Sequence, residues 1–489
     1  MGKDDRDEIK ENPTFYDDIQ YFFDPQDVSC MRGVRQLDLA NYESVKANAQ
    51  NIYFQVKSGR MPPAEAERRW PENRVQTFRN WIKNKHPMGH RPLDVSLFIP
   101  ATGDVTIPAR RDAAALSRTE IDKLAEAFRG LMSRDPTDAQ SYFALAGIHW
   151  FPAPSWCVHH QPQYNPWHRV YIDLFEDGLR TVPGCENVTL PYWDITRPPP
   201  AWMYEPPFDS YVLQADASED YPAGTRTEHD PADEIAQAVL AYDIPQMIRE
   251  ALNDDSFEGF TEKIEAAHDS GHGASGPSMS ATDIAAFDPL FWFFHCNWER
   301  LWWAWQVRHK AGTLEGFRAA LARPGEAEWL EPGFDALDPF GRTTGSTIDI
   351  STYRYDSAPL EVFDALAAAP RGNIGIERTF RLTQAPRVSV RVKDIARLRM
   401  SGSFNVYLLA DGEPIARRLF FQSTVPEKCP NCVNQPLVHV DFRLDRALLE
   451  GKSLRVEVEE IRPGGERRVV DPDSIGSPTV NIRELVDGE

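Results

Sequence analysis

The spacing of hydrophobic positions changes along this chain and divides it into three stretches. Residues 1–95 mix aromatic and polar positions and end in a stretch with helical spacing. Residues 96–350 are helix-rich, with proline-rich interruptions that are typical of surface loops. Residues 375–489 alternate apolar and polar positions in short segments, which is typical of strands. We therefore expect a small N-terminal helical domain, a mainly α central domain and a C-terminal β-sandwich domain.

The helix predicted over residues 74–82 marks the end of the N-terminal stretch. Through Cys30, Met31 and the Arg-Met-Pro-Pro segment at residues 60–63, this stretch weakly resembles small helical cytochrome-like modules. It lacks the Cys-x-x-Cys-His sequence that attaches c-type haem. We therefore expect a helical domain without haem.

Alternation in the C-terminal stretch is clearest in four segments, at residues 387–392, 404–409, 437–442 and 454–458. Turn-forming sequences such as Asp411-Gly412 separate them. Cys429 and Cys432 form a Cys-x-x-Cys pair on a loop between two of the segments. Taken alone, such a pair indicates a redox pair, half of a zinc site or a clip for a soft metal. The lack of a second pair in the sequence disfavours structural zinc.

Bulk composition describes an ordinary globular chain of 489 residues, 42% hydrophobic and 26% charged. Its net charge of −21 disfavours nucleic acids and membranes as partners and favours a small neutral or cationic substrate. No apolar run is long enough to span a bilayer, and the charged N-terminus lacks the apolar core of a signal peptide. Six cysteines are too few for a disulfide framework. We therefore expect a cytoplasmic protein with reduced thiols. The sequence is also compatible with a homo-oligomer.

Histidines are the most informative polar residues of the central stretch, because they fall into two sets of three. The sets are His149, His159 and His168, and His268, His272 and His295. Imidazole is the usual nitrogen ligand of copper, iron and zinc. Three neutral imidazoles leave a coordination position open on a metal, and two such metals face to face could hold dioxygen between them. The pattern therefore favours a redox site for oxygen.

Each histidine gives only weak support on its own. His268 and His272 are four residues apart among good helix formers, which places both on one helix face. His295 lies in an aromatic run, where a core histidine is the simpler interpretation. The first set lies at helix ends and in a loop. Together the six predict a four-helix bundle that directs histidines inward around a pair of metals.

The joint pattern resembles the family of tyrosinases, catechol oxidases and molluscan haemocyanins, which hold a coupled pair of copper ions. Its motifs are Gly-Ile-His at 147–149, Cys-Val-His at 157–159, Pro-Trp-His-Arg at 166–169, Leu-Pro-Tyr-Trp-Asp at 190–194, the His268/His272 pair, and Asp-Pro-Leu-Phe at 288–291 followed by His295 and Arg300. The resemblance covers about residues 140–310. It implies that each histidine set binds one copper ion and that dioxygen is a co-substrate.

Two positions depart from the family's pattern. Phe294 stands where the family usually has a histidine, and Glu299 stands where it usually has an aspartate. Both changes are compatible with copper binding and bear on the detailed activity.

Cys157 precedes His159 by two residues. A lone cysteine is commonly a small buried thiol. In fungal and molluscan relatives, however, a cysteine at this position is joined to the histidine by a thioether bond. The resemblance thus predicts a Cys157–His159 crosslink that forms after copper has bound.

Two carboxylates near His268 also match functional positions of the family. Glu265 matches a carboxylate that holds a water beside the second copper ion in monophenol-oxidising relatives, and its alternative is an exposed helix glutamate. A phenol titrates near pH 10, so a base must help at neutral pH. Asp269 occupies a position associated with the tuning of activity.

Latent proenzymes of the family suggest a role for the C-terminal domain. In them, a β-domain covers the active site, a cysteine pair receives copper and an aromatic side chain plugs the entrance. The resemblance implies that Cys429 and Cys432 pass copper toward Cys157, and thiolates suit Cu(I). It also makes Phe420 or Phe421 the candidate plug, although both could be ordinary strand residues.

The function implied is a latent tyrosinase, or polyphenol oxidase, that uses two copper ions and dioxygen to oxidise a small phenol or o-diphenol to an o-quinone. Two alternatives stay open. One is a catechol or o-aminophenol oxidase that lacks monophenolase activity. The other is an oxygen-binding protein of haemocyanin type.

Overall fold

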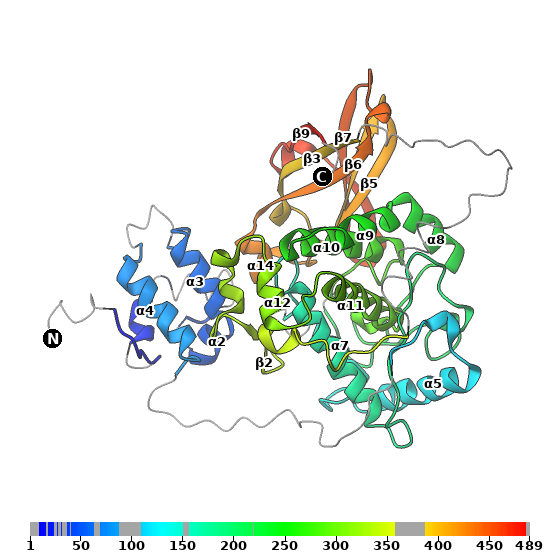
Figure 1. The fold of residues 1–489 in the computed structure, drawn as a ribbon, viewed down its shortest axis with the longest axis horizontal. Helices are drawn as coiled ribbons and strands as arrows, with labels where there is room; N and C mark the ends of the chain where they lie inside the picture. The colour runs from blue at the N-terminus through cyan, green and yellow to red at the C-terminus, as the bar shows by residue number, and fades with distance from the viewer. Residues whose placement is uncertain are drawn as a thin grey trace.

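A computed structural model of the chain contains three groups of elements, each with a hydrophobic core (Figure 1). It describes residues 9–15, 18–23, 27, 31, 37–39, 41–62, 69–87, 109–149, 156–218, 220–356 and 387–485. The N-terminal helices and the C-terminal strands both lie against the central helices. The boundaries of the three predicted domains remain predictions.

The N-terminal group is helical. Its elements are the 3-10 helix η1 (Ile19–Phe22) and the helices α2 (Tyr42–Ala47), α3 (Ala49–Lys57) and α4 (Glu72–Lys83). The helix predicted over residues 74–82 is α4, and its hydrophobic face is buried. Phe334 of the central group is also buried in this core, where its ring centroid lies 5.3 Å from that of Tyr53. This contact joins the N-terminal helices to the central group.

Helices dominate the central group, as predicted. They are α5 (Arg118–Met132), α6 (Tyr142–Gly147), α7 (Tyr164–Arg180), α8 (Ala232–Ala241), α9 (Ile244–Leu252), α10 (Phe257–Ala274), α11 (Leu290–Arg308) and α12 (Leu314–Ala319), with the short strands β1 (Ala336–Leu337) and β2 (Arg342–Thr343). Ser117 caps α5 in a capping box with Glu120. Residues on every face of α11 are buried for most of its length, which makes it the central helix of the group.

Buried ion pairs fix α7 against α11, two of the helices that carry histidines. Arg169 of α7 donates from Nε to Glu299 of α11 at 2.6 Å. Arg110 lies 3.0 Å from Glu299 and 3.1 Å from Glu176 of α7. All four side chains are buried, and breaking such a pair by removing one partner costs roughly 3–5 kcal/mol. The network therefore holds the two helices in one relative position.

Two antiparallel sheets pack on one core in the C-terminal group. The strands are β3 (Arg387–Ala396), β4 (Phe404–Ala410), β5 (Glu413–Phe420), β6 (Leu437–Asp445), β7 (Leu454–Ile461), β8 (Arg467–Val470) and β9 (Thr479–Glu484), in the orders β6-β3-β9 and β5-β4-β7-β8. The four segments predicted as strands are β3, β4, β6 and β7. The short helix α14 (Pro430–Asn434) lies between β5 and β6. Figure 1 shows this group on the side of α9 and α10, and β5 contacts α10.

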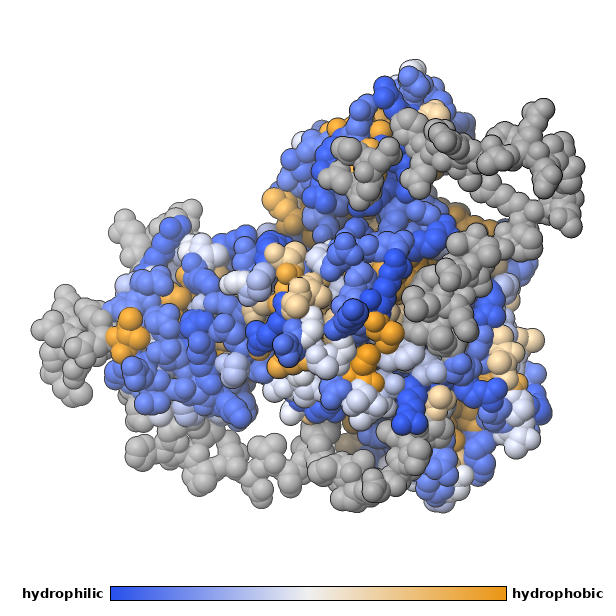
Figure 2. Space-filling model, in the orientation of Figure 1, coloured by the Kyte–Doolittle hydropathy of each residue, from blue (hydrophilic) through white to orange (hydrophobic). Residues whose placement is uncertain are grey.

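The surface in Figure 2 is mostly hydrophilic, with small separate hydrophobic patches. Among the described residues, no helix combines the length and the apolar character needed to cross a bilayer.

Candidate metal centre

The second histidine set forms a compact group of three ring nitrogens. His268 and His272 lie on α10 and His295 lies on α11. Their Nε2 atoms are separated by 2.9 Å (His272 to His268), 3.4 Å (His268 to His295) and 3.3 Å (His295 to His272). Nδ1 of His268 lies 3.1 Å from Asp269, and Nδ1 of His272 lies 2.7 Å from the carbonyl of Met279. These acceptors favour the proton on Nδ1, so lone pairs converge at Nε2.

The first set approaches from three different segments. His149 follows α6, His159 lies in a loop and His168 lies on α7. Their ring centroids are 5.5 Å (His149 to His159), 5.2 Å (His159 to His168) and 5.9 Å (His149 to His168) apart. Nδ1 of His149 faces the carbonyl of Thr282 at 3.3 Å, and Nδ1 of His168 faces that of Tyr164 at 2.9 Å. All three Nε2 atoms are buried and lack a hydrogen-bond partner within the described parts of the chain.

The two sets face each other. The rings of His168 and His295 stack with centroids 4.7 Å apart, and those of His159 and His268 stack at 5.7 Å. The candidate ligand atoms of the second set lie within 4.8 Å of one another, as do those of His149, Cys157 and His159. The ligand atoms of His168 are not within this distance of all members of the first group. His168 joins that group through the contact of its ring with His159. The fold therefore brings together the six histidines that the sequence singles out.

Burial keeps these imidazoles neutral. It lowers the pKa of His149 to about 4, and together with the neighbouring His149 it lowers the pKa of His168 to about 3. The pKa values of the other four histidines are also lowered well below the usual value, first by burial and then by neighbouring histidines. Neutral, buried imidazoles suit a borderline-soft cation such as copper. The residues present thus fit a pair of copper ions.

Cys157 lies beside a histidine of the first set. It is buried, and its Sγ is 3.3 Å from Nδ1 of His159. The sulfur therefore lies next to the ring to which the predicted thioether would join it. The crosslink itself remains a prediction.

Glu265 and Asp269 are both buried beside the histidines, which excludes the exposed-helix interpretation of Glu265. Glu265 accepts a hydrogen bond from the backbone N–H of His160 at 2.5 Å. Asp269 accepts one from the backbone N–H of Phe421 at 3.0 Å. Burial raises the pKa of both carboxyl groups well above the usual range, and the charge of Asp269 raises that of Glu265 further.

The two candidate plug residues have different surroundings. The Phe421 ring stacks on His272 with centroids 4.1 Å apart and an interplanar angle of 5°, and its centroid lies 5.4 Å from that of His159. The Phe420 ring instead stacks on His160 at 4.1 Å and on Phe404 of the C-terminal core at 5.1 Å. Phe421 therefore covers the histidines, while Phe420 packs behind it.

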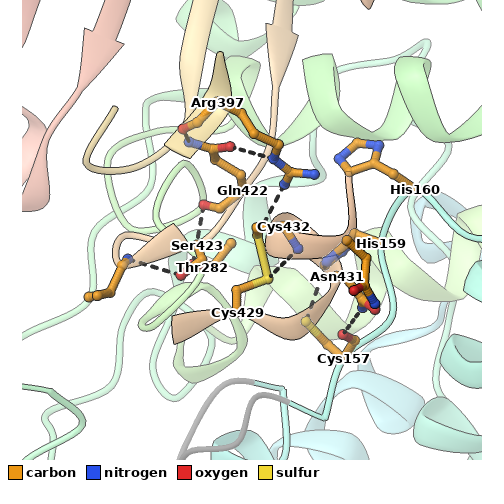
Figure 3. Close-up of a disulfide and its surroundings, with 12 residues drawn as sticks. Cys157, His159, His160, Thr282, Arg397, Gln422, Ser423, Cys429, Asn431 and Cys432 are labelled. Carbon is orange, nitrogen blue, oxygen red and sulfur yellow. Dashed lines mark hydrogen bonds between the residues drawn. A yellow bond between two sulfur atoms is a disulfide. The ribbon is translucent and has the colours of Figure 1, made fainter. Parts of the chain in front are cut away.

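Cys429 and Cys432 form a disulfide beside the first histidine set (Figure 3). The sequence predicts reduced thiols, and this prediction is wrong for Cys429 and Cys432. The other described cysteines, Cys157, Cys185 and Cys296, are not part of this disulfide. Asn431, between the paired cysteines, donates from Nδ2 to the carbonyl of Cys157 at 3.4 Å. The pair thus lies close to the loop that carries His159.

Sequence reasoning missed residues whose partners are distant in the chain. His160 contacts Glu265 and bonds through Nε2 to the carbonyl of Phe421 at 3.1 Å. Tyr164 packs between His168 and His268, with ring centroids 4.7 and 5.0 Å away. The doubled histidine at 159–160 was the only sequence signal for His160, and Tyr164 had none, because both roles arise from contacts between segments that are distant in the chain.

Comparison with known proteins agrees with this geometry. The family model described as the common central domain of tyrosinase matches residues 139–223 and 204–308. A G-type haemocyanin (units Oda to Odg) of Enteroctopus dofleini is 28% identical over 281 residues, which are 52% of this chain and 9% of that protein. The chain therefore spans only a small part of this relative. Residues 139–308 belong to the family of type-3 copper proteins that includes tyrosinases and haemocyanins.

Solved structures share the fold at low sequence identity. The tyrosinase of Burkholderia thailandensis has a TM-score of 0.54 at 18% identity, over 77% of this chain and 99% of that one. A pro-tyrosinase of Aspergillus oryzae has a TM-score of 0.56 at 18% identity, over 80% and 97%. These likenesses establish the tyrosinase and haemocyanin fold, with a helical core and C-terminal sheets.

Proposed function

We propose that this protein is a copper-dependent oxidase that uses dioxygen to convert phenols and o-diphenols to o-quinones. The proposal rests mainly on one observation, the convergence of six neutral, buried imidazoles in two facing groups. Bound copper would supply the binding and two-electron chemistry of dioxygen. The protein's own residues hold the two groups in register through α7, α10 and α11 and exclude bulk water.

We further propose that the enzyme is latent in the intact chain. Phe421 lies against His272 and His159, where a phenol ring would have to approach. Its backbone N–H is bound to Asp269 and its carbonyl to His160, so the plug is held from both sides. The likeness to a pro-tyrosinase of Aspergillus oryzae supports a covered form of the site.

Oxygen uptake by the copper-loaded protein tests this function directly. We expect uptake with a simple monophenol and with catechol, and an increase of about tenfold or more after limited proteolysis removes the C-terminal strands. Uptake with catechol alone would indicate a diphenol oxidase. No uptake before or after cleavage, together with reversible oxygen binding, would refute the oxidase.

Glu265 is proposed to accept the proton of a monophenol. Its buried carboxylate lies three residues from His268, and burial makes it a stronger base than a surface glutamate. We expect Glu265→Gln to lower monophenol-driven oxygen uptake by about a hundredfold and to lower catechol-driven uptake far less. The glutamine oxygen can still accept from His160, so the fold is preserved.

A matched control for Glu265→Gln lies one turn away on the same helix. Glu262 contacts His439 of the C-terminal part at the protein surface. Glu262→Gln should leave the ratio of monophenol to catechol turnover unchanged. An unchanged ratio in Glu265→Gln itself would remove Glu265 from the proposal.

Two alternatives have specific support. The haemocyanin relative favours an oxygen-binding protein. Phe294 and Asp269 support a catechol or o-aminophenol oxidase without monophenolase activity. The ring of Phe294 packs against His272 with centroids 4.7 Å apart, and Asp269 lies beside His268. The oxygen-uptake measurement separates all three.

Cys429 and Cys432 are proposed to receive copper before it reaches the histidines. Their sulfurs suit Cu(I) once the disulfide is reduced, and Asn431 links their helix to the Cys157 loop. The four-helix bundle, the small phenolic substrate, the cytoplasmic location and a homo-oligomer likewise remain predictions.

A further inference from the structure

Arg397 lies behind the plug and contacts the residues on both sides of it. The side chain is 1% exposed. Its Nε donates to Oε1 of Gln422 at 2.9 Å, and Nε2 of Gln422 donates back to the Arg397 carbonyl at 3.1 Å. The guanidinium carbon lies 4.9 Å from the centroid of the Phe420 ring. Arg397 therefore holds Phe420 and Gln422, the two neighbours of Phe421.

The same guanidinium also contacts the cysteine pair. Nη2 of Arg397 donates to Sγ of Cys432 at 3.2 Å, and Figure 3 shows the side chain between Gln422 and the disulfide. Cys432 is itself buried, and its backbone N–H donates to Sγ of Cys429 at 3.2 Å. One planar group thus joins two segments that are separate in the sequence.

We propose that Arg397 is a positioning residue that couples the Cys429–Cys432 pair to the plug at Phe421. The inference rests on the proposed latency. It identifies Arg397 as the contact through which opening or closing of the cysteine pair affects the plug over the histidines. With the pair closed, Arg397 keeps Phe420 and Gln422 in place. When the pair opens, the sulfur contact is lost and the plug segment is held less firmly.

The coupling follows from the shape and burial of a guanidinium. The N–H donors of a guanidinium lie in one rigid plane. When one hydrogen-bond partner moves, the whole group turns, and the direction of the hydrogen bond to the other partner changes. In a buried site, water cannot replace a lost partner, which makes each contact costly to break. Nη1 of Arg397 is also buried, and it has no hydrogen-bond partner within the described residues. The guanidinium therefore has no second acceptor among them that could replace the sulfur contact. A lysine, with one point charge, could not hold both segments.

Opening of the pair is a defined chemical step. An external dithiol supplies two electrons and two protons, the Cys429–Cys432 bond breaks to give two thiols, and the dithiol becomes a cyclic disulfide. Replacing both cysteines with alanine gives an open state that needs no reductant.

Hydrogen exchange of the copper-free full chain, measured by mass spectrometry, tests the coupling. The reporter is the peptide around residues 419–423, which contains the Phe421 amide. We expect about tenfold faster exchange in Arg397→Gln and in the Cys429→Ala/Cys432→Ala variant. The triple variant should exchange no faster than either, because both changes break the same coupling. Peptides from β4 and α11 should be unchanged.

Two further variants complete the test. Arg391→Gln removes an exposed arginine of β3 that pairs with Asp441 and should leave the reporter unchanged. Arg397→Lys keeps the charge and the fold but should still speed exchange of the reporter.

Three outcomes would overturn the proposal. One is wild-type exchange of the reporter in Arg397→Gln or in Arg397→Lys. Another is a triple variant in which the two effects multiply. The third is equal acceleration in β4, which would indicate general loosening of the domain. Because no copper or turnover is involved, the result stays separate from the success or failure of the proposed oxidase.

Discussion

Replacing His268 with asparagine is expected to reduce bound copper from two ions to about one per chain and to abolish oxygen consumption. His268 contributes one of three converging nitrogens, and its Nε2 lies 2.9 Å from that of His272. Two remaining imidazoles hold a metal far less tightly than three, and a single copper cannot carry the two-electron reaction with dioxygen. We expect a loss of at least about a thousandfold in oxygen uptake, measured beside the metal content.

His309 provides the control for this change. It lies just after α11, where it stacks on Trp305 and has no contact with the six histidines among the described residues. His309→Asn should keep full copper content and activity. A His268→Asn protein that still binds two copper ions and consumes oxygen would show that the two histidine groups are not the catalytic metal site.

Replacing Phe421 with alanine is expected to activate the intact chain without proteolysis. The change removes the ring stacked on His272 while leaving the backbone bonds to Asp269 and His160 available. A substrate ring could then occupy the vacated space. We expect catechol-driven oxygen uptake by the uncleaved protein to rise about tenfold or more, and subsequent proteolysis to add little.

Loss of stability alone could also uncover the site, and Phe442 separates the two explanations. Phe442 is fully buried in the C-terminal core, so Phe442→Ala costs roughly 3–5 kcal/mol of stability without touching the histidines. If Phe442→Ala activates the enzyme as much as Phe421→Ala does, unfolding of the cover rather than removal of the plug explains the activity. A Phe421→Ala protein as inactive as the wild type would reject the plug.

The spacing of residues along the chain was sufficient to predict most features of the candidate metal centre. His268 and His272 share a helix face because they are four residues apart, and α10 places them so. Alternating segments became strands because period-two patterns bury one face of a sheet. These features depend on neighbours along the chain, so they can be recognised without knowing the fold. Comparison with the family's motifs then assigned metals to the histidines, which spacing alone could not do.

Contacts between distant segments decided what the sequence left open. The sequence offered Phe420 and Phe421 equally. The choice fell to Phe421 because β5 ends at Phe420, and the next residue turns onto α10, where Asp269 binds its backbone. In the same way, the burial of Glu265 depends on the loop at His160.

By itself, then, the sequence determined the candidate ligand residues, the helical and stranded character of the segments, and the family. Only the tertiary structure decided which phenylalanine covers the histidines, that Glu265 is buried, and that Arg397 lies between the plug and Cys432. The physical reason is that secondary structure follows from periodicity within a few residues. Burial and side-chain partners instead depend on packing between segments that lie far apart in the chain.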